Sequence, residues 1–249
     1  MQLGFITDIG NTRKHNDDCS NAIINEYSQH LLIVCDGLGG YQGGAAASHI
    51  VMNCITNAFL TTDFSEFDLN QIRKWFILNI RNAQKQIDNV VLIQKDSYNM
   101  GTTIVASIIV NNHAFILNIG DSRAYLLDHS NVKQLTVDNN LLETLRARKA
   151  SAEVYDKYQK HLYSLTQFVG RTSNISLSYD LYELELLPNQ ILFLSSDGFH
   201  FHYNLELLYD QLIKANASVD QNTFLNTIIK EAINNGSNDN LSFAFLINN

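Results

Sequence analysis

Short strand-like runs occur in groups along this chain and do not alternate regularly with helices. Three apolar or alternating runs open the sequence, at residues 3–7, 20–26 and 31–35, and a meander of further runs follows two long helical segments. Consecutive parallel strands need a crossover connection, usually a helix, whereas antiparallel strands can be joined by short turns. We therefore expect an α+β protein in which antiparallel sheet is covered by helices on its outer faces.

Two long segments have the residue spacing of amphipathic helices. The first covers about Gly44–Phe59, with apolar residues three to four positions apart. The second begins at Asp68, an N-cap candidate with Gln71 three residues further on, as in a capping box. Its apolar stripe continues for more than five turns and predicts one helical face buried against a sheet. The stripe consists of Ile72, Phe76, Ile80, Ala83, Ile87 and Val91.

The remaining segments are predicted from the same periodicities. Further strands are expected at residues 102–110, 113–119, 124–127, 132–135, 175–186, 191–195 and 241–247. Asn111-Asn112 separates two of these strands, and asparagine tolerates the positive φ of a tight hairpin turn. Helices are expected at residues 141–160, 205–213 and 224–233, the first facing solvent and the last ended by Gly236.

Composition limits the classes of protein that this chain resembles. The 249 residues include 45% hydrophobic residues, one proline and no Gly/Ser-rich linker or repeat, which indicates a single domain over residues 1–249. Lys and Arg number 17 against 25 Asp and Glu, giving a net charge of −8 without any basic run. Nucleic acid and anionic membranes are therefore not expected as partners.

The cysteines and the N-terminus bear on the compartment. Cys19, Cys35 and Cys54 form no C-x-x-C pattern, so a reducing compartment is expected, and Cys35 is interpreted as a small core residue. The N-terminus lacks a basic segment followed by an apolar one, and no apolar stretch reaches the ~18 residues that span a bilayer. We expect a cytoplasmic protein.

Acidic residues recur at the ends of apolar strand-like runs, beside glycine or another turn residue. Each has an ordinary explanation when taken alone, because aspartate in a turn caps local backbone N–H groups. If the strand ends converge, however, the carboxylates would repel one another, and a hard divalent cation with oxygen ligands relieves that repulsion. An oxygen-only site favours Mg²⁺, Mn²⁺ or Ca²⁺ over zinc. The residues are Asp17, Asp18, Asp36, Asp121, Asp197 and Asp239.

Seven short motifs occur in order along almost the whole chain. They are Asp8-Ile-Gly-Asn-Thr-Arg13-Lys-His-Asn16-Asp17-Asp18, Asp36-Gly-Leu-Gly-Gly40 with Gly43-Gly44, Met100-Gly-Thr-Thr103, Gly120-Asp-Ser-Arg-Ala-Tyr125, Leu165-Thr-Gln-Phe-Val-Gly170, Ser196-Asp-Gly198 and Asp239-Asn240. Together they resemble the motifs of the protein phosphatase type 2C family, the metal-dependent PPM phosphatases. The resemblance implies a four-layer α/β/β/α sandwich, two antiparallel sheets flanked by helices, with a flap at about residues 139–163.

The resemblance also implies roles for individual residues. Asp36 would bridge two main metal ions, and the Gly37 carbonyl would bind one of them. Asp197 and Asp239 would complete the shell of the other ion, and Asp121 would join Asp197 at a third ion found in bacterial members. Arg13 would grip the substrate phosphate, a task suited to a planar bidentate donor. Asp17 and Asp18 complete the implied metal-binding set. Asp17 is one methylene shorter than the family's usual residue, so a contact to metal through water is expected.

The implied activity is a metal-dependent protein serine/threonine phosphatase with two, or in bacterial members three, Mn²⁺ or Mg²⁺ ions. A water activated by two metals would attack the phosphoryl group directly, without a phosphoenzyme. The expected partners are phosphoserine and phosphothreonine proteins and a cognate Ser/Thr kinase. The enzyme is expected to be a monomer that reverses the action of this kinase. One alternative is a pseudophosphatase that acts as a regulatory binding module. Another is a phosphatase for a small phosphoprotein that controls a sigma factor.

Four positions depart from the family pattern. Leu38 and Tyr41 stand where some relatives carry histidines, which leaves the proton donor to the leaving group open and favours a bacterial-like member. His200 and His202 follow Ser196-Asp-Gly198. They are interpreted as surface histidines, with a substitute proton donor or an extra metal ligand as the alternative.

Overall fold

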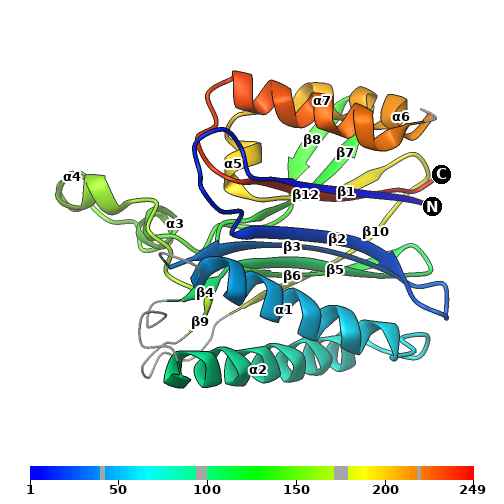
Figure 1. Cartoon of the computed structure of the whole chain (residues 1–249), viewed down its shortest axis with the longest axis horizontal. Helices are drawn as coiled ribbons and strands as arrows, with labels where there is room; N and C mark the ends of the chain where they lie inside the picture. Colours follow the sequence, from blue (N-terminus) through cyan, green and yellow to red (C-terminus); the bar gives the residue numbers. More distant parts are fainter. Residues whose placement is uncertain (40–42, 94–99, 171–178, 218–219) are drawn as a thin grey trace.

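The structure is a computed structural model that describes residues 1–39, 43–93, 100–170, 179–217 and 220–249. Two antiparallel sheets lie face to face, and helices cover the outer face of each (Figure 1). The expected α+β sandwich is therefore confirmed. The chain termini lie close together at one end of the sheets (Figure 1).

The first sheet has five strands in the order β1-β12-β11-β7-β8. These strands are β1 Gln2–Asp8, β12 Leu241–Ile247, β11 Ile191–Ser195, β7 Arg123–Asp128 and β8 Asn131–Gln134. The second sheet has seven strands, in the order β10-β6-β5-β3-β4-β9 with β2 paired to β3. They are β10 Asp180–Glu185, β6 His113–Ile119, β5 Ile104–Val110, β3 His30–Leu38, β4 Gly101–Thr102, β9 Val169–Gly170 and β2 Asp18–Ile24.

Two groups of helices form the outer layers. Helices α1 Gly43–Leu60 and α2 Leu69–Ile93 cover the seven-stranded sheet, whereas α6 Leu208–Ala217 and α7 Gln221–Asn234 cover the five-stranded sheet (Figure 1). The short α5 Asp197–His200 follows β11 directly. Helices α3 and α4 lie in a segment that projects from one end of the molecule (Figure 1). Their bounds are Leu141–Ala147 and Ala152–Tyr158.

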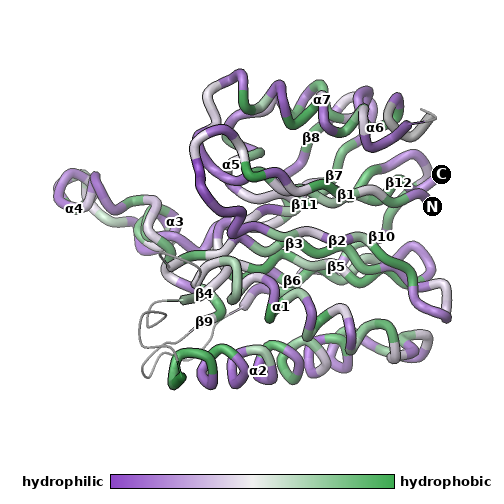
Figure 2. Tube along the Cα trace, viewed as in Figure 1, coloured by the Kyte–Doolittle hydropathy of each residue, from purple (hydrophilic) through white to green (hydrophobic). Residues whose placement is uncertain are grey.

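The alternation of side chains along the central strands builds three apolar layers. In β3, Leu31, Ile33 and Cys35 pack toward α1 and α2, whereas Leu32 and Val34 pack between the sheets. In β12, Phe243 and Phe245 pack toward α6 and α7, and the intervening residues pack between the sheets. These strands are mostly hydrophobic, while the covering helices alternate between hydrophobic and hydrophilic residues (Figure 2). Cys35 is a core residue, as predicted.

Several local predictions are confirmed. The bounds of β6, β11 and β12 are those expected, and Asn111 and Asn112 have φ of 47° and 68° in the turn between β5 and β6. The capping box is also present. The Asp68 backbone N–H donates to Gln71 Oε1 at 2.8 Å, and the Gln71 N–H donates to Asp68 Oδ1 at 2.7 Å.

Other segments differ from the prediction for physical reasons. The strand expected at 102–110 is divided at Thr103, whose N–H donates to the Asp36 carbonyl at 2.8 Å and not to the ladder of β5. The helix expected at 141–160 is broken into α3 and α4 around Lys149, which has a φ of 51°. Residues 205–207 form a 3-10 turn before α6. Residues 175–178 lie outside the described residues, and β10 begins at Asp180.

No helix within the described ranges combines the length and the apolar character needed to cross a membrane.

Candidate active site

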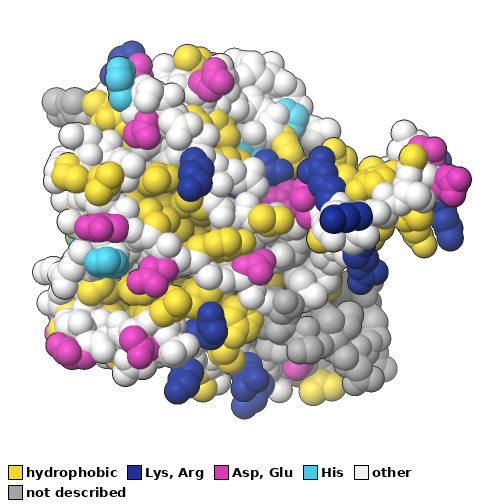
Figure 3. Space-filling model, turned by 180° about the vertical axis from the view of Figure 1, so that it is seen from behind, with side chains coloured by type: hydrophobic (Ala, Val, Ile, Leu, Met, Phe, Trp, Pro, Cys, Tyr) yellow, Lys and Arg dark blue, Asp and Glu magenta, His cyan; other side chains and the backbone are white. Residues whose placement is uncertain are grey.

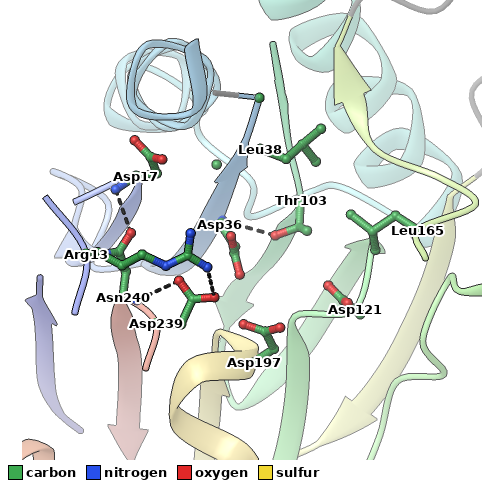
Figure 4. Close-up of a pocket in the computed structure, with 12 residues that line it drawn as sticks. Arg13, Asp17, Asp36, Leu38, Thr103, Asp121, Leu165, Asp197, Asp239 and Asn240 are labelled. Carbon is green, nitrogen blue, oxygen red and sulfur yellow. Dashed lines mark hydrogen bonds and ion pairs between the residues drawn. The ribbon is translucent and has the colours of Figure 1, made fainter. Parts of the chain in front are cut away.

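The strand ends that carry the acidic residues meet at one end of the sandwich. Asp36 lies near the end of β3, Asp121 follows β6, Asp197 follows β11, and Asp239 precedes β12. Strands β11 and β12 are antiparallel, so the end of one lies beside the start of the other. The carboxylates of all four aspartates point toward a common space between the two sheets (Figure 4).

This space is a pocket of about 320 Å³. It brings together every site residue predicted from the sequence except Asp18. The lining also includes residues that were not predicted as site residues, namely Leu38, Gly39, Thr103, Leu165 and Asn240. The predicted site residues that line the pocket are Arg13, Asp17, Asp36, Gly37, Asp121, Asp197 and Asp239.

Asp18 lies behind the pocket wall. It is 3% exposed and stands opposite Asp36 in the register of β2 and β3. The Ser196 hydroxyl donates to Asp18 Oδ2 at 2.6 Å. Burial, opposed by this hydrogen bond and reinforced by the charge of Asp197, raises the pKa of Asp18 to about 7. Asp18 therefore adds negative charge beneath Asp36 without reaching the pocket surface.

The pocket concentrates negative charge in a poorly solvated place. Burial, followed by the charges of Asp18 and Asp197, raises the pKa of Asp36 well above its usual range. Burial and the charge of Asp197 raise the pKa of Asp121 to about 7. Burial and the charge of Asp239 also raise the pKa of Asp197. These carboxylates can ionise together at neutral pH only if positive charge enters the pocket.

The protein's own cations offset little of this charge. The Arg13 guanidinium reaches Asp239 Oδ2 at 2.7 Å from the rim, with its side chain 52% exposed. The Arg123 guanidinium is bound to both carboxylate oxygens of Asp138, at 2.8 and 2.7 Å, which is outside the pocket lining. The unbalanced group is therefore Asp36 with Asp121 and Asp197.

The donor set fits hard divalent cations. All the candidate ligands are carboxylate or carbonyl oxygens, which suit Mg²⁺ or Mn²⁺ and leave no soft ligand for zinc. In the described part of the chain, no three His, Cys, Asp or Glu side chains are already gathered as a ready-made ligand cluster. Ions that bind here would therefore complete their shells with water, as Mg²⁺ commonly does.

Two residues hold the acidic segments in place. Thr103 Oγ1 accepts the Asp36 N–H at 3.0 Å and lies 2.7 Å from Ser122 Oγ, which links β3 to the turn that carries Asp121. Asn240 accepts the Asp17 N–H at 2.9 Å and donates to the Ile9 and His15 carbonyls. Both lie inside the sequence motifs, but hydrogen bonds between distant segments leave no periodic signal in the sequence.

Gly198 is required by a close backbone approach. A Cβ atom at this position would lie 2.1 Å from the Asn240 carbonyl oxygen, closer than any real contact. We expect Gly198→Ala to lower the free energy of unfolding by about 3 kcal/mol, because backbone must move to admit the methyl group. Urea denaturation measures this. The matched control is Gly43→Ala, whose nearest atom is Met100 Cβ at 3.1 Å, and equal transition midpoints for the two variants would contradict the assignment.

One of the two histidines at positions 200 and 202 differs from the sequence interpretation. His200 is not a surface residue: it is 6% exposed, its Nδ1 lies 3.2 Å from Ser195 Oγ, and burial holds its pKa well below the usual value. It faces inward because the short α5 turns its side chain against Tyr125. His202 is only half-buried. Neither lines the pocket. Of the two positions that depart from the histidine pattern, Leu38 lines the pocket and Tyr41 lies outside the described residues.

Comparison with known proteins places these features in a family. Residues 9–164 match the family model described as Protein phosphatase 2C. The chain is 32% identical over 241 residues to a putative protein phosphatase of Mycoplasma genitalium, covering 95% of this chain and 91% of that relative. It resembles the solved structure of the S. agalactiae serine/threonine phosphatase, with a TM-score of 0.84, 26% identity and 98% of each chain covered.

A second solved structure shares the fold at lower identity. It is the catalytic domain of the serine threonine protein phosphatase PstP in complex with two manganese ions. The TM-score is 0.77 at 22% identity, with 100% of this chain and 98% of that chain covered.

Proposed function

The chain belongs to the protein phosphatase 2C family and is a protein serine/threonine phosphatase, and we propose that the aspartate-lined pocket is its active site. The observation that carries this proposal is the convergence of four strand-end aspartates and Arg13 on one pocket. Arg13, Asp36, Asp197 and Asp239 all lie at the pocket. No feature of the described site favours the pseudophosphatase alternative.

We assign the metal-binding roles as follows. Asp36 would be shared by the two main Mn²⁺ or Mg²⁺ ions, and the Gly37 carbonyl beside it would bind one of them. Asp197 and Asp239 would complete one of these shells, and Asp121 with Asp197 would hold a third ion. Asp17 would act through water, because its Oδ1 already accepts the Ala45 N–H at 3.1 Å. Asp18 would support Asp36 from behind, through its charge and its bond to Ser196.

The chain's own groups position the substrate. Arg13 stands at the rim with only one guanidinium nitrogen on Asp239, so its other N–H groups can receive phosphoryl oxygens. Bound divalent ions would supply an activated water and neutralise charge on the phosphoryl group. The Leu38 side chain has no ionisable group, so it cannot protonate the departing serine or threonine oxygen.

Several finer properties belong to the same proposal. We propose that residues 1–249 act as one phosphatase domain, with a flap at about 139–163 built around α3 and α4. We also propose a cytoplasmic monomer that reverses a Ser/Thr kinase. Support for the reducing compartment comes from the free thiols of Cys19, Cys35 and Cys54, and the net charge of −8 supports protein over nucleic-acid substrates.

The test is hydrolysis of p-nitrophenyl phosphate and of a phosphothreonine peptide with Mn²⁺, with Mg²⁺ and with EDTA. We expect metal-dependent activity that EDTA abolishes. Asp239→Asn should lower kcat/KM by at least about a hundredfold, because it removes one ligand charge and the partner of Arg13. Asp210→Asn is the matched control, since Asp210 is exposed beside His129 on another face. The proposal would be refuted if folded wild-type protein were inactive both with Mn²⁺ and with Mg²⁺.

A further inference from the structure

Two exposed aromatic rings touch where the flap meets the body of the protein. Tyr163, at the end of the flap, is 66% exposed, and Phe201, just after α5, is 51% exposed. Their ring centroids are 6.5 Å apart at an interplanar angle of 77°. Single exposed apolar residues are ordinary, but two rings from segments far apart in sequence form a surface suited to an apolar side chain. We call Tyr163 and Phe201 the aromatic pair.

The aromatic pair borders the active-site pocket. The Phe201 N–H donates to the Asp197 carbonyl at 3.2 Å, so the two residues are one helical turn, or about 6 Å, apart. Tyr163 precedes Leu165, a lining residue, by two positions. Leu165 lies on the opposite side of Asp36 from Arg13 (Figure 4). A substrate whose phosphate rests between Arg13 and Asp36, and whose chain runs toward Leu165, would come close to the aromatic pair.

The aromatic pair has a rigid support. The Arg123 guanidinium lies 4.9 Å from the centroid of the Phe201 ring, and the same guanidinium is fixed by two hydrogen bonds to Asp138. On the flap side, the Leu141 N–H donates to the Ser164 carbonyl at 3.0 Å, next to Tyr163. Because the rings are held before a ligand arrives, little ordering entropy opposes its binding.

Charge around the aromatic pair suits an acidic polypeptide. The flap at 139–163 carries five Lys and Arg residues against three Asp and Glu residues, a net of +2. The rest of the chain then holds 12 against 22, a net of −10. Lys and Arg side chains gather where the projecting flap joins the body, with hydrophobic side chains between them (Figure 3). Helix α2 is also net basic, with Arg73, Lys74, Arg81 and Lys85 against Asp88, but the flap contains Tyr163 of the aromatic pair, and its positive charge attracts phosphorylated, acidic segments.

We propose that the aromatic pair receives a large apolar side chain two positions from the phosphorylated residue of an extended, acidic phosphopeptide. In an extended chain, residues two apart point the same way and lie about 6.6 Å apart. A side chain two positions from the phosphorylated residue therefore reaches about one helical turn beyond the pocket wall, which is how far Phe201 lies from Asp197. The proposal rests on the proposed function, and it assigns a sequence preference to that site. Phe201 and Tyr163 act here as specificity residues and have no part in the chemistry.

The test compares matched phosphothreonine peptides under Mn²⁺. Each has the same acidic flanks, with leucine two positions before the phosphothreonine, leucine two positions after it, or alanine at both. We expect wild type to prefer one leucine peptide over the alanine peptide by about tenfold in kcat/KM. Phe201→Ala and Tyr163→Ala should each bring that ratio close to one. The ratio is taken within each variant, so a general loss of activity cancels. Tyr158→Ala, another flap aromatic, should leave the ratio unchanged.

The outcomes separate the two proposals. Hydrolysis of p-nitrophenyl phosphate without any leucine preference in wild type would overturn the docking inference and leave the phosphatase assignment standing. A preference that survives in both Phe201→Ala and Tyr163→Ala would also overturn it. Absence of all metal-dependent hydrolysis would overturn the proposed function, and the docking inference with it.

Discussion

Asp36→Asn is expected to lower Mn²⁺-dependent kcat by at least about a thousandfold, because it removes charge from the proposed ligand shared by two ions. The same change should stabilise the metal-free protein. Burial and neighbouring carboxylates raise the pKa of Asp36 well above its usual range, so the neutral amide relieves a cost that the folded apo protein carries. We expect the Tm in EDTA to rise by about 2–4 °C, the shift that about 1 kcal/mol produces in a chain of this size.

A substitution that lowers kcat but raises the Tm of the metal-free protein distinguishes a metal-site aspartate from a structural one. Asp128→Asn is the control: its carboxylate accepts a hydrogen bond from the Ser130 N–H in an exposed turn, so neither kcat nor apo stability should change much. Steady-state kinetics and thermal unfolding followed by circular dichroism give the two quantities. If Asp36→Asn destabilised the metal-free protein, the carboxylate would be held by favourable contacts and the repulsion argument would be wrong.

Much of the fold could be predicted because its signals are local. Short apolar runs located β6, β11 and β12, and the Asp68–Gln71 pair located the start of α2. The acidic strand ends were also visible in the sequence. Their convergence was a hypothesis until the antiparallel register of β11 and β12 placed Asp197 and Asp239 at the same end of the sheet.

What could not be predicted depends on contacts between distant segments. Thr103 leaves its strand because Asp36 offers it a carbonyl from another strand, and no property of residues 102–110 alone encodes that exchange. His200 was interpreted as a surface histidine because a lone histidine is seldom a metal ligand or an acid, yet the turn of α5 buries it against Tyr125. The contact between Tyr163 and Phe201 likewise joins positions 38 residues apart that no single-segment pattern connects.

The pH dependence of stability should invert when metal is removed. In EDTA, the folded-state pKa of about 7 for Asp18 and Asp121 lies above the ordinary aspartate value of 3.8, so protonation of these two residues favours folding. That contribution is full below pH 3.8 and is lost as pH rises through about 7. The Tm of the metal-free protein should therefore rise as pH falls from 8 to 6.5. Below pH 6.5 a second group opposes this rise in Tm. Burial lowers the pKa of His200 in the folded protein, so protonation of this histidine favours the unfolded chain.

Saturating Mn²⁺ should reverse this trend over the same range. Cations that bind the folded pocket stabilise it by about 2.7 kcal/mol when present at a hundred times their Kd, and protons compete for the same carboxylates as pH falls. The gain in Tm from Mn²⁺ should thus be largest near pH 8 and shrink toward pH 6.5. Asp63 and Asp220 do not contribute in this window, because hydrogen bonds from Ser65 and Thr223 lower their pKa values below 3.8. A Tm in EDTA that falls steadily as the pH is lowered from 8 to 6.5 would show that the aspartates are not clustered in the metal-free protein. The requirement for metal, which was argued from their repulsion, would then lose its basis.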